Sequence, residues 1–273
     1  MPFKSGPHVQ PPTSLARRHF MNIAAAGAGR LSAIAISTSL IAAKSADAMG
    51  LFPRDDPRDD RGHHCFGRGT LILTPDGEIP IENLSVGDLV MTMRGLLPVR
   101  WIGRKTMEKS ASASWHPTVL PVRVSRFSID EQTPHRDLYL SPTHSLLLEG
   151  FLIPVKHLIN GSSIAVDKEA REVATIEYFC IKLDTHEVVF AEGVAAETFQ
   201  YRGGLINWDN LPEYDALYGG ERQLMTPFEP HCEYKGGRAE LRALLRLAAS
   251  RFVDMRDPIQ IAYGHIAARA MAS

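Results

Sequence analysis

The residue in this sequence whose type and surroundings best suit chemistry is Cys65. Three cysteines occur, at 65, 180 and 232, and none forms a C-x-x-C pair, so neither a disulfide framework nor a cysteine-rich zinc site is indicated. Cys65 follows two histidines and precedes a Phe-Gly pair, a polar setting that suits a reactive thiol. Cys180 lies inside an apolar run, which is typical of a buried and inert thiol. Cys65 is therefore the predicted nucleophile.

A cysteine can attack the carbonyl carbon of the peptide bond that precedes it. At Cys65 this attack converts the His64–Cys65 amide into a thioester, a reaction that is uphill for an unstrained amide. The surrounding fold then has to supply two kinds of help. One group must protonate the departing amide nitrogen, and another must orient or polarise the scissile amide.

Short β-rich runs separated by turn residues make up the region that must position these groups. Pro75-Asp76-Gly77 lies between two apolar runs and predicts a hairpin turn. No helix longer than two turns is expected before residue 200. Many short strands at close spacing favour an all-β domain. The predicted strands are 70–74, 79–81, 89–93, 99–102, 119–124, 137–140, 145–148, 164–166, 176–183 and 187–191.

Four sequence blocks follow one another along this β-rich region. The first runs from Cys65 to Val90, the second covers 138–147, the third covers 151–158 and the fourth covers 179–199. Together, and in this order, they resemble the Hedgehog/intein-like (Hint) domain family. The resemblance covers about half of the chain. It implies a compact, horseshoe-type β fold over residues 65–199.

The resemblance also implies roles for three further side chains. The second block of the family has the pattern Thr-x-x-His after a strand, and here Ser141 takes the Thr position and His144 the His position. By this resemblance His144 donates a proton to the departing nitrogen, and Ser141 holds the scissile amide through its hydroxyl. His186, in the fourth block, is either a second acid/base or a packed histidine, and the sequence leaves both open.

The last block departs from the family pattern in a way that limits the reaction. Splicing inteins end this block with a His-Asn pair whose Asn cyclises, and Glu197-Thr198 stand at those positions here. Arg100 falls near the position of the Asp that activates a sterol in animal Hedgehog domains. The resemblance therefore supports neither splicing nor sterol transfer. What remains is an acyl shift and cleavage at the His64–Cys65 bond, with the chain's own N-terminal segment as substrate and water or a small thiol as acceptor.

The first 48 residues predict export. They contain the pair Arg17-Arg18, a small-residue apolar run from Ile23 to Ala43, and an A-x-A site at 46–48. These are the parts of a cleaved secretory signal, and the paired arginines resemble the twin-arginine type. Arg30 interrupts the apolar run, which disfavours a stable membrane span. The predicted location is the bacterial periplasm or the extracellular space.

Two further segments flank the predicted domain. Residues 49–64 contain two Pro-Arg-Asp-Asp units, which cannot bury a core and predict a charged linker. Residues 200–273 form a partly helical extension, in which 238–252 has apolar residues at helical spacing and arginines on the other faces. This helix either docks on the β domain or binds a membrane surface.

Composition removes some classes of function. The formal net charge of −1 and the lack of a long basic run exclude a nucleic-acid binder. No cofactor site and no metal site is expected. Four glutamates, Glu177, Glu187, Glu192 and Glu197, show no spacing typical of a catalytic pair and are predicted to lie on solvated faces.

Three functions remain open at the level of sequence. The first is an exported domain that cleaves itself once, before Cys65, and is not a turnover enzyme. The second is a catalytically silent Hint-fold module that binds or supports structure in the cell envelope. The third is a cysteine hydrolase that acts on other substrates through Cys65 and His144.

Overall fold

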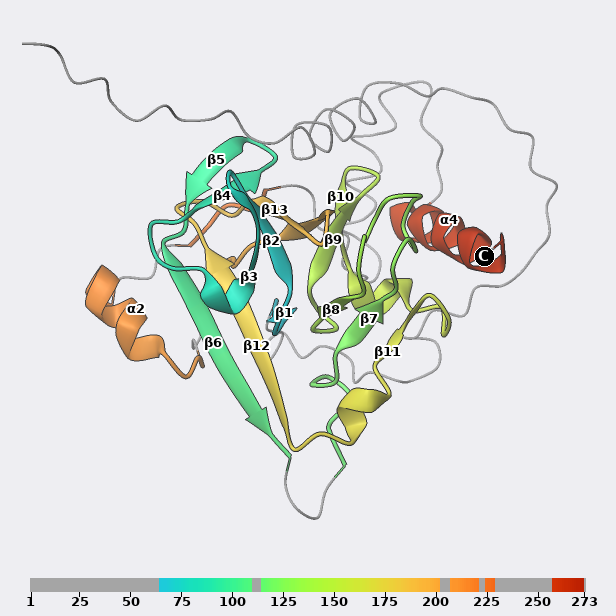
Figure 1. Cartoon of the computed structure of the whole chain (residues 1–273), viewed down its shortest axis with the longest axis horizontal. Coiled ribbons are helices and arrows are strands. Elements are labelled where there is room, and N and C mark those ends of the chain that lie inside the picture. Colours follow the sequence, from blue (N-terminus) through green and yellow to red (C-terminus); the bar gives the residue numbers. More distant parts are fainter. Residues whose placement is uncertain (1–63, 110–113, 202–206, 221–223, 229–256, 273) are drawn as a thin grey trace, which may run out of the picture.

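Short apolar runs bounded by turn residues give this chain short strands, several of which bury alternate residues. The strand Leu71–Thr74, for example, alternates between half-buried and buried residues. The computed structural model describes residues 64–109, 114–201, 207–220, 224–228 and 257–272. The predicted signal, nearly all of the predicted linker, Cys232 and the predicted helix at 238–252 lie outside these residues. In the described part the strands form two antiparallel sheets, which confirms the all-β prediction (Figure 1).

The first sheet has six strands and contains the start of the predicted domain. The two-residue strand β1 lies between β8 and β12, and pairs Phe66 with Leu140 on one side and with Phe179 on the other. Along the sheet the order is β11 (Ile164–Val166), β7 (Val122–Val124), β8 (Leu138–Leu140), β1 (Phe66–Gly67), β12 (Thr175–Lys182) and β6 (Trp101–Glu108).

The second sheet has eight strands and contains the last block of the sequence. Its main path is β10 (Phe151–Pro154), β9 (Ser145–Leu148), β14 (Val194–Glu197), β13 (Val188–Ala191), β2 (Leu71–Thr74) and β3 (Gly77–Pro80), and β4 (Leu89–Thr92) and β5 (Gly95–Pro98) branch from β13. Glu192 and Gly193 join β13 to β14 with positive φ angles of 48° and 82°, which suit a two-residue hairpin turn. The hairpin register places Glu197 opposite Val188.

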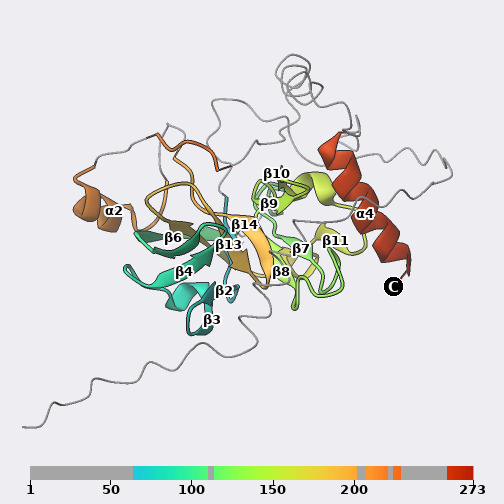
Figure 2. The same cartoon turned by 90° about the horizontal axis from the view of Figure 1, so that it is seen from above.

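Helical structure is sparse in the described residues. Before residue 200 it consists of three 3₁₀ turns, η2 (Ile81–Asn83), η3 (Val155–Leu158) and η4 (Glu169–Arg171), and after it come the α-helices α2 (Leu211–Tyr218) and α4 (Pro258–Ala272). Figures 1 and 2 show α2 and α4 at opposite ends of the molecule. None of the helices in the described part is both long and apolar enough to cross a bilayer.

Two apolar clusters hold these elements together. The larger includes Phe66, Leu140 and Leu146, and it extends to α4 through Ile259, Ala262 and Ile266, which are buried against it. The smaller cluster is built around Trp101, whose indole packs edge-on against Tyr214 of α2 with ring centroids 5.2 Å apart. Cys65, Tyr178 and Cys180 belong to this second cluster. The candidate nucleophile therefore lies in the interior.

Candidate functional site

Cys65 directly precedes β1, and Ser141 at the end of β8 fixes its backbone. The amide N–H of Cys65 donates a hydrogen bond to Oγ of Ser141 at 3.0 Å. In return, the amide of Ser141 donates to the carbonyl of Cys65 at 2.9 Å. The structure thus brings the Ser141 hydroxyl to the nitrogen of the His64–Cys65 bond.

The side chain of Cys65 is buried, which differs from the polar setting that the sequence indicated. Its exposed fraction is 0%, because the thiol enters the cluster that contains Trp101, Tyr178 and Cys180. Burial raises the pKa of the thiol well above its usual value, Cys180 adds to this, and a hydrogen bond with Ser141 opposes it. The resting group is therefore a neutral thiol, and it must lose its proton during an attack. Cys180 is likewise buried, and burial raises its pKa.

His144 lies in the turn between β8 and β9, and the backbone sets its position. Its amide donates to the carbonyl of Ser141 at 3.0 Å, and its carbonyl accepts from the amide of Val155 at 2.8 Å. The imidazole is fully buried and packs edge-on against the ring of Phe66, with centroids 4.3 Å apart. Neither ring nitrogen has a well-formed hydrogen bond within the described residues, although backbone groups of Cys65 and Glu197 lie near it.

The protonation of His144 follows from this burial. Removal from water lowers the pKa of the imidazole to about 4, and the nearby Glu197 carboxylate opposes that decrease. The ring is consequently neutral at pH 7. A neutral imidazole near the backbone of Cys65 has a ring nitrogen that can accept a proton and donate it again.

Glu197, at the end of β14, is the residue of this site that the sequence interpretation missed. It was predicted to lie on a solvated face, but its exposed fraction is 0%. Its Oε1 lies 2.7 Å from Nδ1 of His64 and also accepts a hydrogen bond from the amide of Ser145. Its Oε2 lies 3.5 Å from Nε2 of His186. One buried carboxylate thus connects the residue before the scissile bond with Ser145 of the second block and with His186 of its own block.

The charge of Glu197 is stabilised by these neighbours. Burial alone raises the pKa of its carboxyl, but His64, His186 and His144 outweigh this and hold the pKa well below its usual range. Glu197 is therefore a carboxylate at neutral pH, and the N–H of His64 is directed to it.

His186 is oriented by hydrogen bonding on its other side. Its Nδ1 accepts a hydrogen bond from the amide of Phe228 at 3.0 Å, so in the neutral ring the proton is on Nε2, the nitrogen that faces Glu197. His186 therefore contacts Glu197 with one ring nitrogen and the backbone of Phe228 with the other.

Two of the other glutamates are also buried, contrary to the expectation of solvated faces. Glu187 is 1% exposed and pairs with Arg94 at 3.2 Å, and Glu192 is 1% exposed and accepts a hydrogen bond from the amide of Leu71 at 2.9 Å. The ion pair with Arg94 and the hydrogen bond from the amide of Leu71 offset the cost of removing these two carboxylates from water. Glu177 agrees with the expectation, since its half-exposed side chain pairs with that of Arg68 at the surface.

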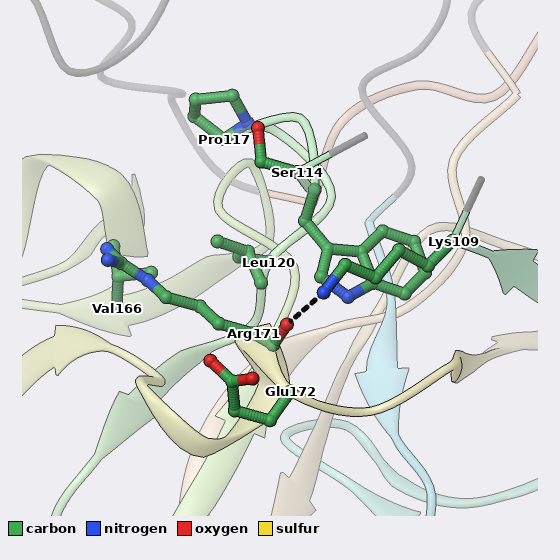
Figure 3. Close-up of a pocket in the computed structure, with 8 residues that line it drawn as sticks. Lys109, Ser114, Pro117, Leu120, Val166, Arg171 and Glu172 are labelled. Atoms are coloured by element: carbon green, nitrogen blue, oxygen red, sulfur yellow. Dashed lines mark hydrogen bonds between the residues drawn. The ribbon is translucent and has the colours of Figure 1, made fainter. Parts of the chain in front are cut away.

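A pocket of about 480 Å³ adjoins the site on the side of His186. A second pocket, of about 400 Å³, borders Leu120, which belongs to the same cluster as Cys65. Figure 3 shows Lys109 at this second pocket, with its ammonium group donating to the carbonyl of Arg171 at 2.7 Å. None of the four predicted site residues lines the second pocket. Within the described residues, no group of three or more His, Cys, Asp or Glu side chains is arranged to hold a metal ion.

Comparison with known proteins gives one family and one group of structures. The family model described as "Hint domain" matches residues 64–203, which is more than half of the chain. The gp41-1 intein is 14% identical, with 48% of this chain and 96% of that chain covered and a TM-score of 0.33. A DnaB intein from Synechocystis is 12% identical, with 50% and 98% covered and a TM-score of 0.33. A bacterial intein-like domain from Clostridium thermocellum is 11% identical, with 50% and 99% covered and a TM-score of 0.29. No curated protein matches the chain.

Proposed function

Since this chain belongs to the Hint domain family, we propose that it cleaves itself by an acyl shift at the His64–Cys65 bond, without splicing. Membership of the family supports an autoprocessing role in general. The finer proposal depends on one observation, the hydrogen bond from the amide of Cys65 to Oγ of Ser141 at 3.0 Å. This contact places a hydroxyl on the nitrogen that has to leave.

In the proposed first step, Sγ of Cys65 attacks the carbonyl carbon of His64. A carbon–sulfur bond forms, and the bond from that carbon to the nitrogen of Cys65 breaks. The thiol proton passes through the neutral ring of His144 to the departing nitrogen, so the step consumes no other reactant. The raised pKa of Cys65 and the low pKa of His144 agree with this transfer. Before the reaction the thiol carries its proton and the imidazole is neutral, so the imidazole can accept that proton.

In the proposed second step, the thioester is resolved by water or by a small thiol. Water leaves a carboxylate on His64 and restores the thiol of Cys65, whereas an added thiol takes the acyl group and forms a new thioester. Splicing is not part of the proposal, because Glu197 and Thr198 stand where the family has its His-Asn pair and neither side chain cyclises as asparagine does.

The proposed substrate is the segment that precedes Cys65 in the same chain. The proposed setting is the periplasm or the outside of a bacterial cell, on the basis of the paired arginines and the A-x-A site in residues 1–48. Each molecule reacts once in this proposal, so the domain is a single-turnover system and not a turnover enzyme.

The proposal is tested on the full chain by intact mass and N-terminal sequencing, with and without dithiothreitol. We expect a fragment that starts at Cys65, faster with added thiol, and no such fragment from Cys65→Ala. Cys180→Ser is the matched control, because Cys180 is the other buried thiol of the same cluster but lies outside the reacting bond. Equal fragmentation of Cys65→Ala and wild type contradicts the proposal.

Two other results distinguish the rival functions. Persistence of the intact chain through long incubation with thiol indicates a silent binding or structural module. Turnover of an added thioester that depends on Cys65, without self-cleavage, indicates a cysteine hydrolase.

A further inference from the structure

We infer that Glu197 recognises the side chain of residue 64, so that the domain selects a hydrogen-bond donor of the shape of histidine immediately before the bond it cleaves. The inference rests on the proposed acyl shift and adds a specificity-determining residue to it. Its basis is the contact of 2.7 Å between Oε1 of Glu197 and Nδ1 of His64.

The contact is short, charge-assisted and buried on one side. Glu197 has an exposed fraction of 0%, and the side chain of His64 is 17% exposed. Hydrogen bonds to an ionised carboxylate are stronger than those between neutral groups, and weak solvation increases the difference. Because Glu197 carries the charge, Nδ1 of His64 is the donor.

Glu197 is also held in place by contacts other than the one with His64. The amide of Ser145 donates to Oε1, and Nε2 of His186 faces Oε2 at 3.5 Å. His186 in turn is fixed by the amide of Phe228. A carboxylate whose two oxygens are positioned by β9 and by His186 presents a fixed acceptor, and a fixed acceptor discriminates between side chains by geometry.

The two sides of the scissile amide are then held by different residues. On the sulfur side, Ser141 binds the nitrogen of Cys65 at 3.0 Å. On the acyl side, Glu197 binds the side chain of His64, the residue whose carbonyl carbon is attacked. Fixing both sides brings carbon and sulfur into a reactive geometry, which lowers the barrier by orientation.

A side chain at position 64 that cannot donate a hydrogen bond removes the contact with Oε1 of Glu197. Alanine or leucine removes the donor from a carboxylate that has no contact with bulk water, and desolvated polar groups discriminate strongly against such replacements. Asparagine keeps a donor, because its Nδ2 stands at about the same number of bonds from the backbone as Nδ1 of histidine. The order of activity at position 64 is therefore expected to be His, then Asn, then Ala and Leu.

The experiment measures the rate of Cys65-dependent cleavage for the full chain with His64 as wild type, His64→Asn, His64→Ala and His64→Leu. We expect His64→Asn to stay within about threefold of wild type and the other two to fall by about tenfold to a hundredfold. Position 64 is partly exposed and precedes the first strand, so these variants keep the fold, which circular dichroism checks.

A second arm identifies the partner of residue 64. Glu197→Gln and the double variant His64→Ala/Glu197→Gln complete a double-mutant cycle, in which we expect the second change to add little once the first is made. Equal rates for all four residues at position 64, or additive effects in the cycle, overturn the inference and leave the acyl shift intact. If wild type shows no Cys65-dependent cleavage, the proposed function fails, and the inferred selectivity fails with it.

Discussion

The amide of Cys65 donates to the hydroxyl of Ser141 at 3.0 Å, and the amide of Ser141 donates to the carbonyl of Cys65 at 2.9 Å. The backbone bond aligns the two strands, and only the hydroxyl bond reaches the departing nitrogen. These two contributions can be separated, because a substitution at Ser141 removes the hydroxyl and leaves the amide.

Removal of that hydroxyl should slow cleavage with little effect on the fold. Ser141→Ala is expected to reduce the cleavage rate by about tenfold, the size of one lost hydrogen bond. Ser141→Thr keeps the hydroxyl and should react within about threefold of wild type. Both rates are measured by intact mass over time. A rate for Ser141→Ala equal to that of wild type shows that the contact has no part in the reaction.

Acidification should destabilise the fold through His144. Its folded-state pKa is about 4, against an ordinary value of 6.5, so the unfolded chain takes up the proton first as pH falls. The effect of His144 on the free energy of unfolding is negligible above pH 7. It grows as the pH falls from about 6.5 to 4 and lowers the free energy of unfolding by about 2 kcal/mol at pH 5. The depressed pKa of Glu197 acts in the same direction but only at lower pH, below its ordinary value of 4.5.

Urea unfolding at pH 7 and pH 5 tests this in a Cys65→Ala chain, in which the proposed cleavage cannot take place. His144→Leu is the comparison, because it keeps an apolar side chain of similar bulk and removes the titration. The loss of unfolding free energy between pH 7 and pH 5 should be about 2 kcal/mol smaller when His144→Leu is added to the Cys65→Ala chain. Identical pH dependence in the two chains contradicts the assignment.

A methyl group at Gly103 should destabilise the second cluster. A Cβ there meets Sγ of Cys180 at 2.6 Å and the indole of Trp101 at 2.7 Å, and both are fully buried. Gly103→Ala is expected to cost about 1–3 kcal/mol of unfolding free energy. Gly264→Ala in α4 is the control, since nothing lies within 4 Å of its Cβ, and it should be neutral or stabilise by up to about 1 kcal/mol.

The docking of α4 is testable in the same way. Ile266 is 2% exposed within the larger cluster, so Ile266→Ala should cost about 2–4 kcal/mol. Met271 lies in the same helix at 76% exposure, and Met271→Ala should change stability by less than about 0.5 kcal/mol. Thermal or urea unfolding measures both. Equal effects at the two positions indicate that α4 is not part of the folded unit.

Most of the fold follows from local pattern. β2 and β4 bury alternate residues and lie within the predicted strands 70–74 and 89–93, and the predicted strands 145–148 and 164–166 match β9 and β11 residue for residue. The missed strands lack that pattern. β5 and β10 each end in proline, β14 has the sequence Val-Ala-Ala-Glu with low strand propensity, and β1 is two residues long. Pairing with neighbours, and not propensity, makes these segments strands.

The candidate site was predictable only in part, for a related reason. Ser141 and His144 follow a strand within a block and could be located from sequence order. Glu197 could not be identified as buried, because a glutamate in a short apolar run is usually exposed, and its partners are 52 and 133 positions away at Ser145 and His64. The available signal was its place in the last block, where the family has a side chain that acts on the reaction.

The position of β1 between β8 and β12 has a consequence for the time course of the proposed reaction. After the bond at His64 is broken, the new amino terminus at Cys65 stays fixed between two strands, so reacted and unreacted molecules share one fold. The His64–Cys65 bond cannot re-form once the severed segment has diffused away. The fraction of chains with a free amino terminus at Cys65 is therefore a cumulative record of how long a population has met its acceptor.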